Sequence, residues 1–325
     1  MIIKSIDKLK YTKEKKLIKI AQSDINDGLN INQEYIIYKK NNEISIYDRT
    51  CDHRGGRLIS KDQEIKCPIH NWVFNAKLGK YTNGIIKRKV PYDIKNNQLL
   101  FYNYNYTPKI VNSTKFKDEK KVKLRFFNHA FLKFQTKRIS FCTDPWAIGP
   151  AFNNGWWLKK NTHKDWIKEL NDSNFVYISH NHPDHLHPLT LSKLDKNKLI
   201  LVPNFLSNST YLFLKDEGFK NITKLDFENQ YKFDNSNLVL TLFKSGDFRE
   251  DSGIYFSVGE FTALLDVDAG NINFNKLPKV SLYCSSFAGG ASGFPTMFDT
   301  YTEEQKKKII NLDRKFIISK KLKNL

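Results

Sequence analysis

Ser179-His180-Asn181-His182-Pro183-Asp184-His185-Leu186-His187 is the stretch of this sequence that decides how the rest is interpreted. Half of the eight histidines lie in these nine residues, beside one aspartate. Imidazole and carboxylate groups together are ligands that zinc, iron and manganese take in proteins. A histidine-rich surface loop is the alternative, but four imidazoles beside a carboxylate cost stability unless something binds them. The stretch therefore predicts a metal site.

The residues around this stretch explain its spacing. Residues 175–178 form a β-branched and aromatic run that predicts a buried strand. His180 and His182, two positions apart, would then leave the strand end on one side. Pro183 breaks the extended chain, and a helix is expected to begin at Asp184 and His185, where the turn would aim both side chains back at the same point.

Length and composition bound the class of protein. At 325 residues the chain is long enough for two domains, and 40% apolar residues with five Trp indicate a globular protein. No apolar run approaches membrane-spanning length, and the N-terminal sequence lacks a signal-peptide pattern, so we expect a cytoplasmic protein with no membrane span. Four Cys fit a reducing compartment, where cysteines are more often ligands than disulfides.

The net charge of +19 invites a nucleic-acid interpretation. However, the lysines are spread along the whole chain, and no basic helix with interleaved aromatics and no nucleic-acid motif is found. We therefore expect no nucleic-acid partner. A positive field instead favours anionic small substrates and acidic electron-transfer proteins.

The first half of the chain carries a second set of metal-ligand residues. Residues 34–39 and 43–47 predict a β-hairpin joined by an Asn turn. The hairpin leads to Cys51-Asp52-His53-Arg54-Gly55-Gly56, and thirteen residues separate His53 from Cys67-Pro68-Ile69-His70.

Two Cys-His pairs on separate tight loops are what a Rieske [2Fe-2S] centre requires. Cys51 and Cys67 would hold one iron through thiolates, and His53 and His70 would hold the other through imidazoles. A structural zinc site built from the same four residues is the alternative. The order C-x-H followed by C-x-x-H favours the cluster, because zinc sites commonly use C-x-x-C and H-x-x-x-H pairs.

Composition divides the chain into two parts. Strand-like runs at residues 90–94 and 99–102 close a small all-β module, and a charge run at residues 115–121 indicates a linker. We expect a Rieske domain at residues 1–108, a linker at 109–121 and a metal-binding catalytic domain at 122–325. The second domain should open with a strand pair at 124–134 and 139–144 and continue as an alternating α/β series. A helix is expected at 164–170, and later strands at 199–202, 238–243, 254–258 and 262–265.

The pattern H-x-H-x-D-H after a strand, with Asp144-Pro145 one strand pair earlier, resembles the metallo-β-lactamase fold. The resemblance implies a metal-site scaffold, an αβ/βα sandwich, and does not fix the reaction. It implies that one metal is held by His180 and His182, a second position by Asp184 and His185, and that Asp268 is the bridging carboxylate. His129 matches a histidine near the metal in one branch of the fold, and a satisfied core histidine is the alternative.

Two departures from that fold concern the second metal. The fold usually supplies a histidine between the cluster and the bridging Asp, and another near the C-terminus, but no histidine follows His187. Asp247 occupies about the place of the first one, so a carboxylate is expected to substitute there. Without the last histidine, we expect a mononuclear iron site rather than a complete two-metal hydrolytic site.

Longer motifs make the resemblance more specific. Residues 144–152, Gly155-Trp156-Trp157, Tyr177-Ile178-Ser179-His180 and residues 287–295 are together similar to the CMP-N-acetylneuraminate hydroxylase family. The resemblance implies an enzyme that takes electrons from a cytochrome b5-type carrier and uses O2 to hydroxylate the methyl of an N-acetyl group. Family members extend beyond the position of Leu325, so the second domain is expected to be incomplete at its C-terminus.

The expected protein is thus an α+β two-domain iron protein, with a Rieske cluster and mononuclear iron (or zinc), that acts as a monooxygenase on an amino sugar. The expected partners are a nucleotide sugar or amino sugar, O2, and a cytochrome b5-like or ferredoxin-like donor with its reductase. The chemistry agrees, because breaking an unactivated C–H bond with O2 needs electrons delivered one at a time, and a hydrolase needs no such donor. The alternatives are a zinc hydrolase with a structural or redox-sensing Rieske module, and a truncated electron carrier.

Overall fold

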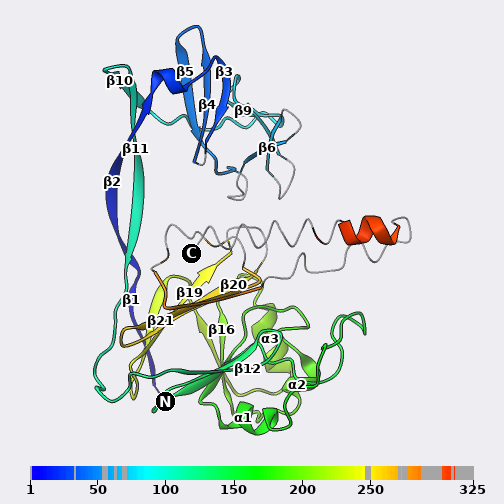
Figure 1. Ribbon diagram of the computed structural model, residues 1–325. Coiled ribbons are helices and arrows are strands. Elements are labelled where there is room, and N and C mark those ends of the chain that lie inside the picture. Colours follow the sequence, from blue (N-terminus) through cyan, green and yellow to red (C-terminus); the bar gives the residue numbers. More distant parts are fainter. Residues whose placement is uncertain are drawn as a thin grey trace.

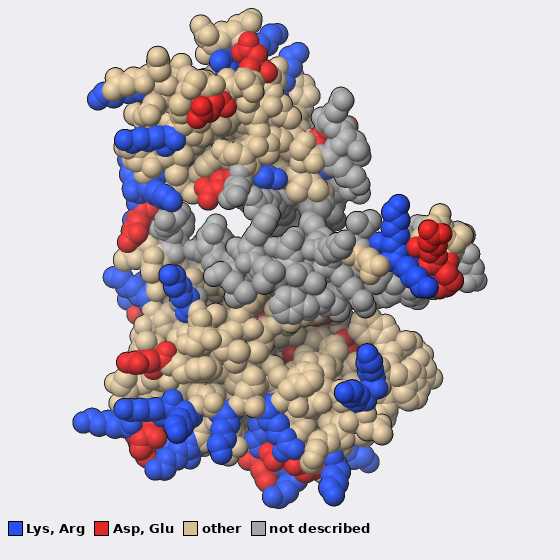
Figure 2. All heavy atoms as spheres, viewed as in Figure 1, with Lys and Arg blue, Asp and Glu red and all other residues tan. Residues whose placement is uncertain are grey.

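A computed structural model describes residues 2–32, 34–52, 58–61, 64–67, 72–245, 250–269, 272, 277, 279–286, 302–308 and 311. Three groups of predicted site residues lie outside this part of the chain: His53 and His70, Asp247, and the glycine-rich residues 287–295. Figure 1 shows a small β module and a larger α/β part joined by a long two-stranded ribbon. Figure 2 shows Lys and Arg side chains spread over the visible face of both.

The small module consists of short antiparallel strands. One sheet has the order β3 (Gly28–Ile31), β4 (Tyr35–Lys40), β5 (Glu43–Asp48). A second has the order β6 (Ile59–Lys61), β7 (Glu64–Lys66), β8 (Val73–Asn75), β9 (Lys80–Tyr81). The predicted hairpin at β4 and β5 is confirmed, and its turn residues Asn41 and Asn42 have φ of 50° and 68°, the left-handed region that a tight hairpin turn needs.

The ribbon joins strands that contain the predicted runs at residues 90–94 and 99–102 to an N-terminal strand that the sequence did not predict. β2 (Lys10–Ala21) pairs antiparallel with β11 (Gln98–Lys109) over its whole length, and β10 (Tyr92–Lys95) pairs with β11 on its other side. β1 (Ile3–Lys8) leaves the ribbon and pairs with β18 in the larger part. The division at residues 108 and 121 stays a prediction, with the exception that residues 3–8 belong to the second sheet system.

The larger part contains two six-stranded sheets. The first has the order β12 (Lys123–Asn128), β13 (Phe131–Gln135), β14 (Ser140–Thr143), β15 (Phe175–Tyr177), β16 (Leu199–Pro203), β17 (Asn221–Leu225). The second has the order β1, β18 (Asn229–Phe233), β19 (Leu238–Lys244), β20 (Ser252–Val258), β21 (Phe261–Val267), β22 (Leu282–Ser285). β14 to β17 are parallel, as the alternating α/β pattern predicted.

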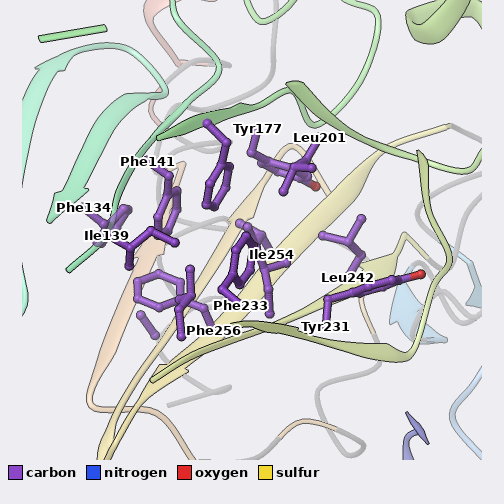
Figure 3. Packing of buried hydrophobic residues seen from close by; sticks show 14 of the residues in the cluster. Phe134, Ile139, Phe141, Tyr177, Leu201, Tyr231, Phe233, Leu242, Ile254 and Phe256 are labelled. Carbon is purple, nitrogen blue, oxygen red and sulfur yellow. The ribbon is translucent and has the colours of Figure 1, made fainter. Parts of the chain in front are cut away.

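The main core lies between the two sheets. Aromatic rings from both sheets meet there, among them Phe141 and Phe233 (Figure 3). The Phe141 and Phe175 ring centroids are 4.9 Å apart, and the Phe175 centroid lies 5.1 Å from that of Phe233. A second core covers the other face of the first sheet, where α1 (Trp166–Asp172), α2 (Pro188–Leu191) and α3 (Ser209–Asp216) pack. The first sheet is therefore buried on both faces, which explains the continuous apolar run at residues 175–178. The predicted two-part α+β architecture is confirmed, and the larger part consists of two facing sheets with helices on the outer face of the first.

Two local predictions need correction. Residues 124–134 are two strands, β12 and β13, separated by a turn in which His129 has φ of 47°. No helix begins at Asp184: residues 182–186 form a turn, and α2 starts at Pro188 with His187 as its N-cap. Proline favours the first helical position, so it sets the start of the helix.

The predicted linker at residues 109–121 is partly packed. The Glu119 carboxylate is buried and accepts hydrogen bonds from Asn237 N at 2.5 Å and Ser236 Oγ at 2.8 Å. The segment therefore docks onto the turn between β18 and β19. The described helices are all too short or too polar to span a lipid bilayer.

Candidate metal centres

The ends of three strands converge on one group of histidine and aspartate side chains. His180 and His182 follow β15, Asp268 follows β21, and Asp144 follows β14. The His180 Nε2 atom lies 2.8 Å from His182 Nδ1 and 3.7 Å from Asp268 Oδ2, and His182 Nδ1 lies 4.0 Å from Asp268 Oδ2. These three residues can offer one ligand atom each to a single ion. The predicted pairing of His180 with His182 is therefore present in the fold.

A second group lies beside the first. His129 Nε2 is 3.2 Å from Asp184 Oδ2, and His185 Nε2 is 3.5 Å from the same oxygen. His129, Asp184 and His185 again offer three ligand atoms within 4.8 Å of one another. His185 Nε2 also lies 3.7 Å from Asp268 Oδ2, so Asp268 reaches both groups, as a bridging carboxylate must. The residues fit one ion or two.

A buried aspartate orients the imidazoles from behind. Asp144 is fully buried, and its carboxylate accepts hydrogen bonds from Ser179 N and Ser179 Oγ, both at 2.7 Å. Asp144 Oδ2 lies 3.3 Å from His185 Nδ1, and Ser179 Oγ lies 2.9 Å from His180 Nδ1. The Asp144 carboxylate next to His185 Nδ1 and the Ser179 hydroxyl next to His180 Nδ1 leave each Nε2 facing the site, and outer carboxylates and hydroxyls orient metal-binding histidines in this way. The sequence showed the Asp144-Pro145 motif but did not predict that Asp144 orients the metal-binding imidazoles.

Sequence reasoning also missed Asp251. It precedes β20, is 2% exposed, and its Oδ1 lies 3.7 Å from His180 Nε2. The predicted substitute in this segment was Asp247, which lies outside the described residues. Asp251 belongs to the same segment, and the structure places it at the site. A role for Asp247 stays a prediction.

His187 has a different role from its neighbours. It is buried, its Nδ1 lies 3.0 Å from Thr190 Oγ1 and accepts from Thr190 N, and its Nε2 lies 3.0 Å from Pro150 O. Both ring nitrogens therefore have protein partners. His187 caps α2 and fixes the loop at residue 150, and it belongs to neither ligand group.

The electrostatics of the site favour a cation. Burial lowers the pKa of His185, but the carboxylates of Asp144, Asp184 and Asp268 outweigh this effect and raise it to about 9. Burial alone would raise the pKa of Asp184. The hydrogen bond from His129 and the charges of His185 and His129 outweigh this effect and lower the pKa of Asp184 below its usual range. Carboxylates surround the imidazoles closely enough that positive charge at this point is stabilised.

Two buried atoms test whether a metal fits. His185 Nε2 and Asp184 Oδ1 have no hydrogen-bond partner among the described residues. Buried polar atoms are rarely left unpaired in native proteins, and both atoms belong to one ligand group. An imidazole and carboxylate donor set suits iron or zinc. These residues therefore fit a bound metal.

The backbone around the site is strained. His129, Asp144 and Val267 have φ of 47°, 37° and 48°. The left-handed region is unfavourable for residues other than glycine, especially for a β-branched valine. Each such residue costs on the order of 1–3 kcal/mol, and strain of this kind concentrates at functional sites.

The small module brings the two predicted thiolate ligands together. Cys51 and Cys67 are buried in one apolar cluster with Tyr81, and Cys67 N donates to Trp72 O at 2.8 Å. None of the four cysteines forms a disulfide. Pairing of these thiolates with His53 and His70 stays a prediction.

Residues 13–91 match the family model of the Rieske [2Fe-2S] domain. The cytidine monophosphate-N-acetylneuraminic acid hydroxylase of Gorilla gorilla gorilla is 31% identical over 341 residues, which cover 94% of this chain and 56% of that protein. The hydroxylase of the same name from Mus musculus is 31% identical over 92% of this chain and 56% of that protein. The one from Xenopus laevis is 29% identical over 89% of this chain and 52% of that protein. The chain spans a little over half the length of these relatives.

Solved structures align less closely. An isothiocyanate hydrolase from Delia radicum gut bacteria is 18% identical, with a TM-score of 0.36 over 45% of this chain and 62% of that one. CmlA, a diiron β-hydroxylase from Streptomyces venezuelae, is 14% identical, with a TM-score of 0.34 over 70% of this chain and 44% of that one. The sequence similarity is the more specific finding: residues 13–91 match a Rieske [2Fe-2S] domain, and 94% of the chain is similar in sequence to a cytidine monophosphate-N-acetylneuraminic acid hydroxylase.

Proposed function

We propose that this chain is a Rieske-fed, iron-dependent monooxygenase that hydroxylates the N-acetyl methyl group of a nucleotide-linked amino sugar. One observation supports the proposal. The same chain contains a domain of the type that holds a one-electron [2Fe-2S] cluster and, separately, two histidine–aspartate groups that fit metal ions. A hydrolase needs no electron supply, whereas an oxygenase needs one.

The proposed reaction balances with an external reductant. One methyl C–H bond is replaced by C–OH, and the second oxygen atom of O2 leaves as water, with two electrons and two protons consumed. Metal held by the two ligand groups would supply the O2-reducing chemistry, and a cluster held by Cys51, His53, Cys67 and His70 would supply electrons one at a time.

The chain's own residues orient and enclose the site. Asp144 and Ser179 fix the rings of His185 and His180, and these groups are buried, so water has no access from that side. The open side is at His182, whose side chain is 45% exposed, and at His129. A substrate must therefore approach past these two imidazoles.

Aromatic side chains border this open side. The Phe152 ring centroid lies 6.1 Å from that of His182, and Trp146 lies 5.3 Å from His129. Three Trp residues lie in this region: Trp146 is buried beside the metal ligands, Trp156 packs on Phe152, and Trp157 is exposed. An amino sugar carrying a base would find both polar ligands and stacking surfaces here.

The partners follow from charge and chemistry. The net charge of +19 favours an anionic nucleotide sugar and an acidic one-electron carrier of the cytochrome b5 or ferredoxin kind, reduced by its own reductase. Cysteines free of disulfides suit a reducing compartment such as the cytoplasm.

The test is a turnover assay with anaerobically purified, iron-loaded protein, a chemical one-electron reductant, CMP-sialic acid and ¹⁸O₂. We expect iron at both kinds of site and one ¹⁸O atom in the N-acyl group of the sugar. Zinc as the only metal outside the cluster, with turnover that needs neither O2 nor reductant, would establish a hydrolase instead. A protein that accepts electrons but does not bind the nucleotide sugar would be an electron carrier.

A further inference from the structure

A buried lysine lies next to the first predicted cluster ligand. Lys87 is 2% exposed, and its ammonium group donates to Thr50 O at 2.5 Å, Asp52 Oδ2 at 3.1 Å and Asp48 Oδ1 at 3.2 Å. An ammonium group has three protons, and three oxygen acceptors surround it here. A buried charge is tolerated only when it is paired and hydrogen-bonded in this way.

The partners of Lys87 identify the segment that it holds. Thr50 and Asp52 are the two residues on either side of Cys51, and Asp52 separates Cys51 from His53 in the Cys-x-His motif. Lys87 therefore fixes the backbone carbonyl of Thr50, before Cys51, and the side chain of Asp52, after it.

Tyr81 also forms hydrogen bonds with Asp52. Its hydroxyl donates to Asp52 Oδ2 at 2.8 Å and accepts from Asp52 N at 3.1 Å. Burial raises the pKa of Tyr81 far above neutral pH, so the hydroxyl keeps its proton and remains a donor. Asp52, whose side chain is 37% exposed, is thus held by Lys87 and Tyr81 together, and Tyr81 belongs to the module core that contains Cys51 and Cys67.

Fixed charges at this position act on any cluster bound there. Reduction adds one electron to a [2Fe-2S] cluster, so a nearby positive charge stabilises the reduced form and a nearby negative charge destabilises it. Lys87 carries +1, and it lies against the two carboxylates of Asp48 and Asp52. Removal of the lysine would leave both carboxylates without their buried counter-ion.

We propose that the Lys87–Asp52 ion pair sets the reduction potential of the cluster, with Lys87 as a positioning residue that holds the Cys51 loop and offsets the negative charge of Asp52. The inference rests on the proposed function, because it requires a cluster at Cys51, His53, Cys67 and His70. It adds a determinant of the cluster's potential that lies outside its four ligands.

The test is a dithionite titration of the full chain, with redox mediators, followed by the EPR signal of the reduced cluster. Lys87→Met removes the charge and keeps an apolar stem, and we expect the reduced-to-oxidised ratio at the wild-type midpoint to fall roughly tenfold, about 59 mV for a one-electron couple. Asp52→Asn removes the negative charge and keeps an acceptor for Tyr81, and we expect a shift in the opposite direction. Lys39→Met is the matched control, since it removes one charge from β4 of the same module, where the partners are Asp27 and Ile25 O.

The pair of opposite shifts distinguishes a charge effect from damage to the loop. Shifts of the same sign in Lys87→Met and Asp52→Asn, or shifts no larger than that of Lys39→Met in protein with full cluster content, would overturn the inference and leave the proposed function intact. If Lys87→Met binds no cluster, Asp52→Asn decides alone, because only a raised potential supports the ion pair. A wild-type protein with zinc at the four ligands would refute the proposed function itself.

Discussion

At the scale of single residues, Asp144 shows how much of the site depends on a side chain that touches no metal position. Its carboxylate bonds to Ser179 and lies against His185, so it sets the orientation of imidazoles in both ligand groups. Such outer carboxylates fix the ring and raise its basicity as a ligand.

Asp144→Asn should weaken metal binding without unfolding the chain. The amide keeps the size of the side chain but loses the negative charge beside His185, and we expect metal affinity to fall about 10- to 100-fold. Competition titration with a metal chelator measures this. Asp172→Asn, which changes an exposed carboxylate on α1, is the control and should bind metal like the wild type. Equal affinity in both variants would rule out the orienting role.

His180→Ala and His187→Ala form a second matched pair. Both histidines are buried in one stretch, but His180 faces the ligand group whereas His187 bonds to Thr190 and Pro150. We expect His180→Ala to lose metal outside the cluster, and His187→Ala to keep it with a stability cost of about 1 kcal/mol from the lost helix cap. Elemental analysis together with the cluster's EPR signal is the measurement. Loss of the cluster signal in His180→Ala would contradict separate sites.

These residues also show what a sequence can predict about a site. His180, His182, Asp184 and His185 were found because they lie in one short motif after a strand, where local geometry brings them together. Asp251 was missed, because its place depends on the antiparallel pairing of β19 with β20, which returns the chain to His180. A contact of that kind is set by tertiary packing, which a single sequence does not show.

At the scale of elements, the strands with alternating or continuous apolar residues were predicted, and those rich in lysine were not. β15, β16, β19, β20 and β21 lie where the apolar runs predicted them. β2 was missed, because five of its twelve residues are lysine and it is stabilised by pairing along its whole length with β11. Strand propensity depends on such context, so composition misleads where neighbouring strands supply the stabilising contacts.

The segment at residues 109–121, predicted as a linker, is the second such element, because its charge gave no sign of a buried carboxylate. Residues 115–121 are highly charged, but Glu119 is buried and accepts from Asn237 N, Ser236 Oγ and Thr136 Oγ1. Glu119→Ala should therefore destabilise the second domain by about 3 kcal/mol, because it leaves buried donors without an acceptor. Urea unfolding measures the change in the free energy of unfolding.

The neighbouring residue supplies the control for this prediction. Asp118 pairs with Lys137 and Arg138 on the surface, where ion pairs are screened by water. Asp118→Ala should leave the unfolding midpoint close to that of the wild type. Equal and small effects of both substitutions would mean that residues 115–121 are an undocked linker after all.

At the scale of the whole molecule, the chain combines a small β module for a cluster with a two-sheet scaffold for metal, joined by the β2–β11 ribbon (Figure 1). The two-part fold was predictable, because each part has its own ligand motif and its own pattern of apolar residues. The connection was not, because β1 leaves the N-terminal segment to pair with β18. The β2–β11 ribbon and the pairing of β1 with β18 therefore connect the two parts. The order of motifs along the chain does not reveal either connection.

The central claim is that electrons enter at the cluster and are used at the histidine–aspartate groups. Its most direct test is the rate at which the dithionite-reduced cluster is reoxidised by O2 in the presence of CMP-sialic acid, in the wild type and in a His180→Ala variant with full cluster content. We expect rapid reoxidation in the wild type and much slower reoxidation in the variant. Equal rates in the two proteins would contradict it, because the electrons would then leave the cluster without passing to the second site.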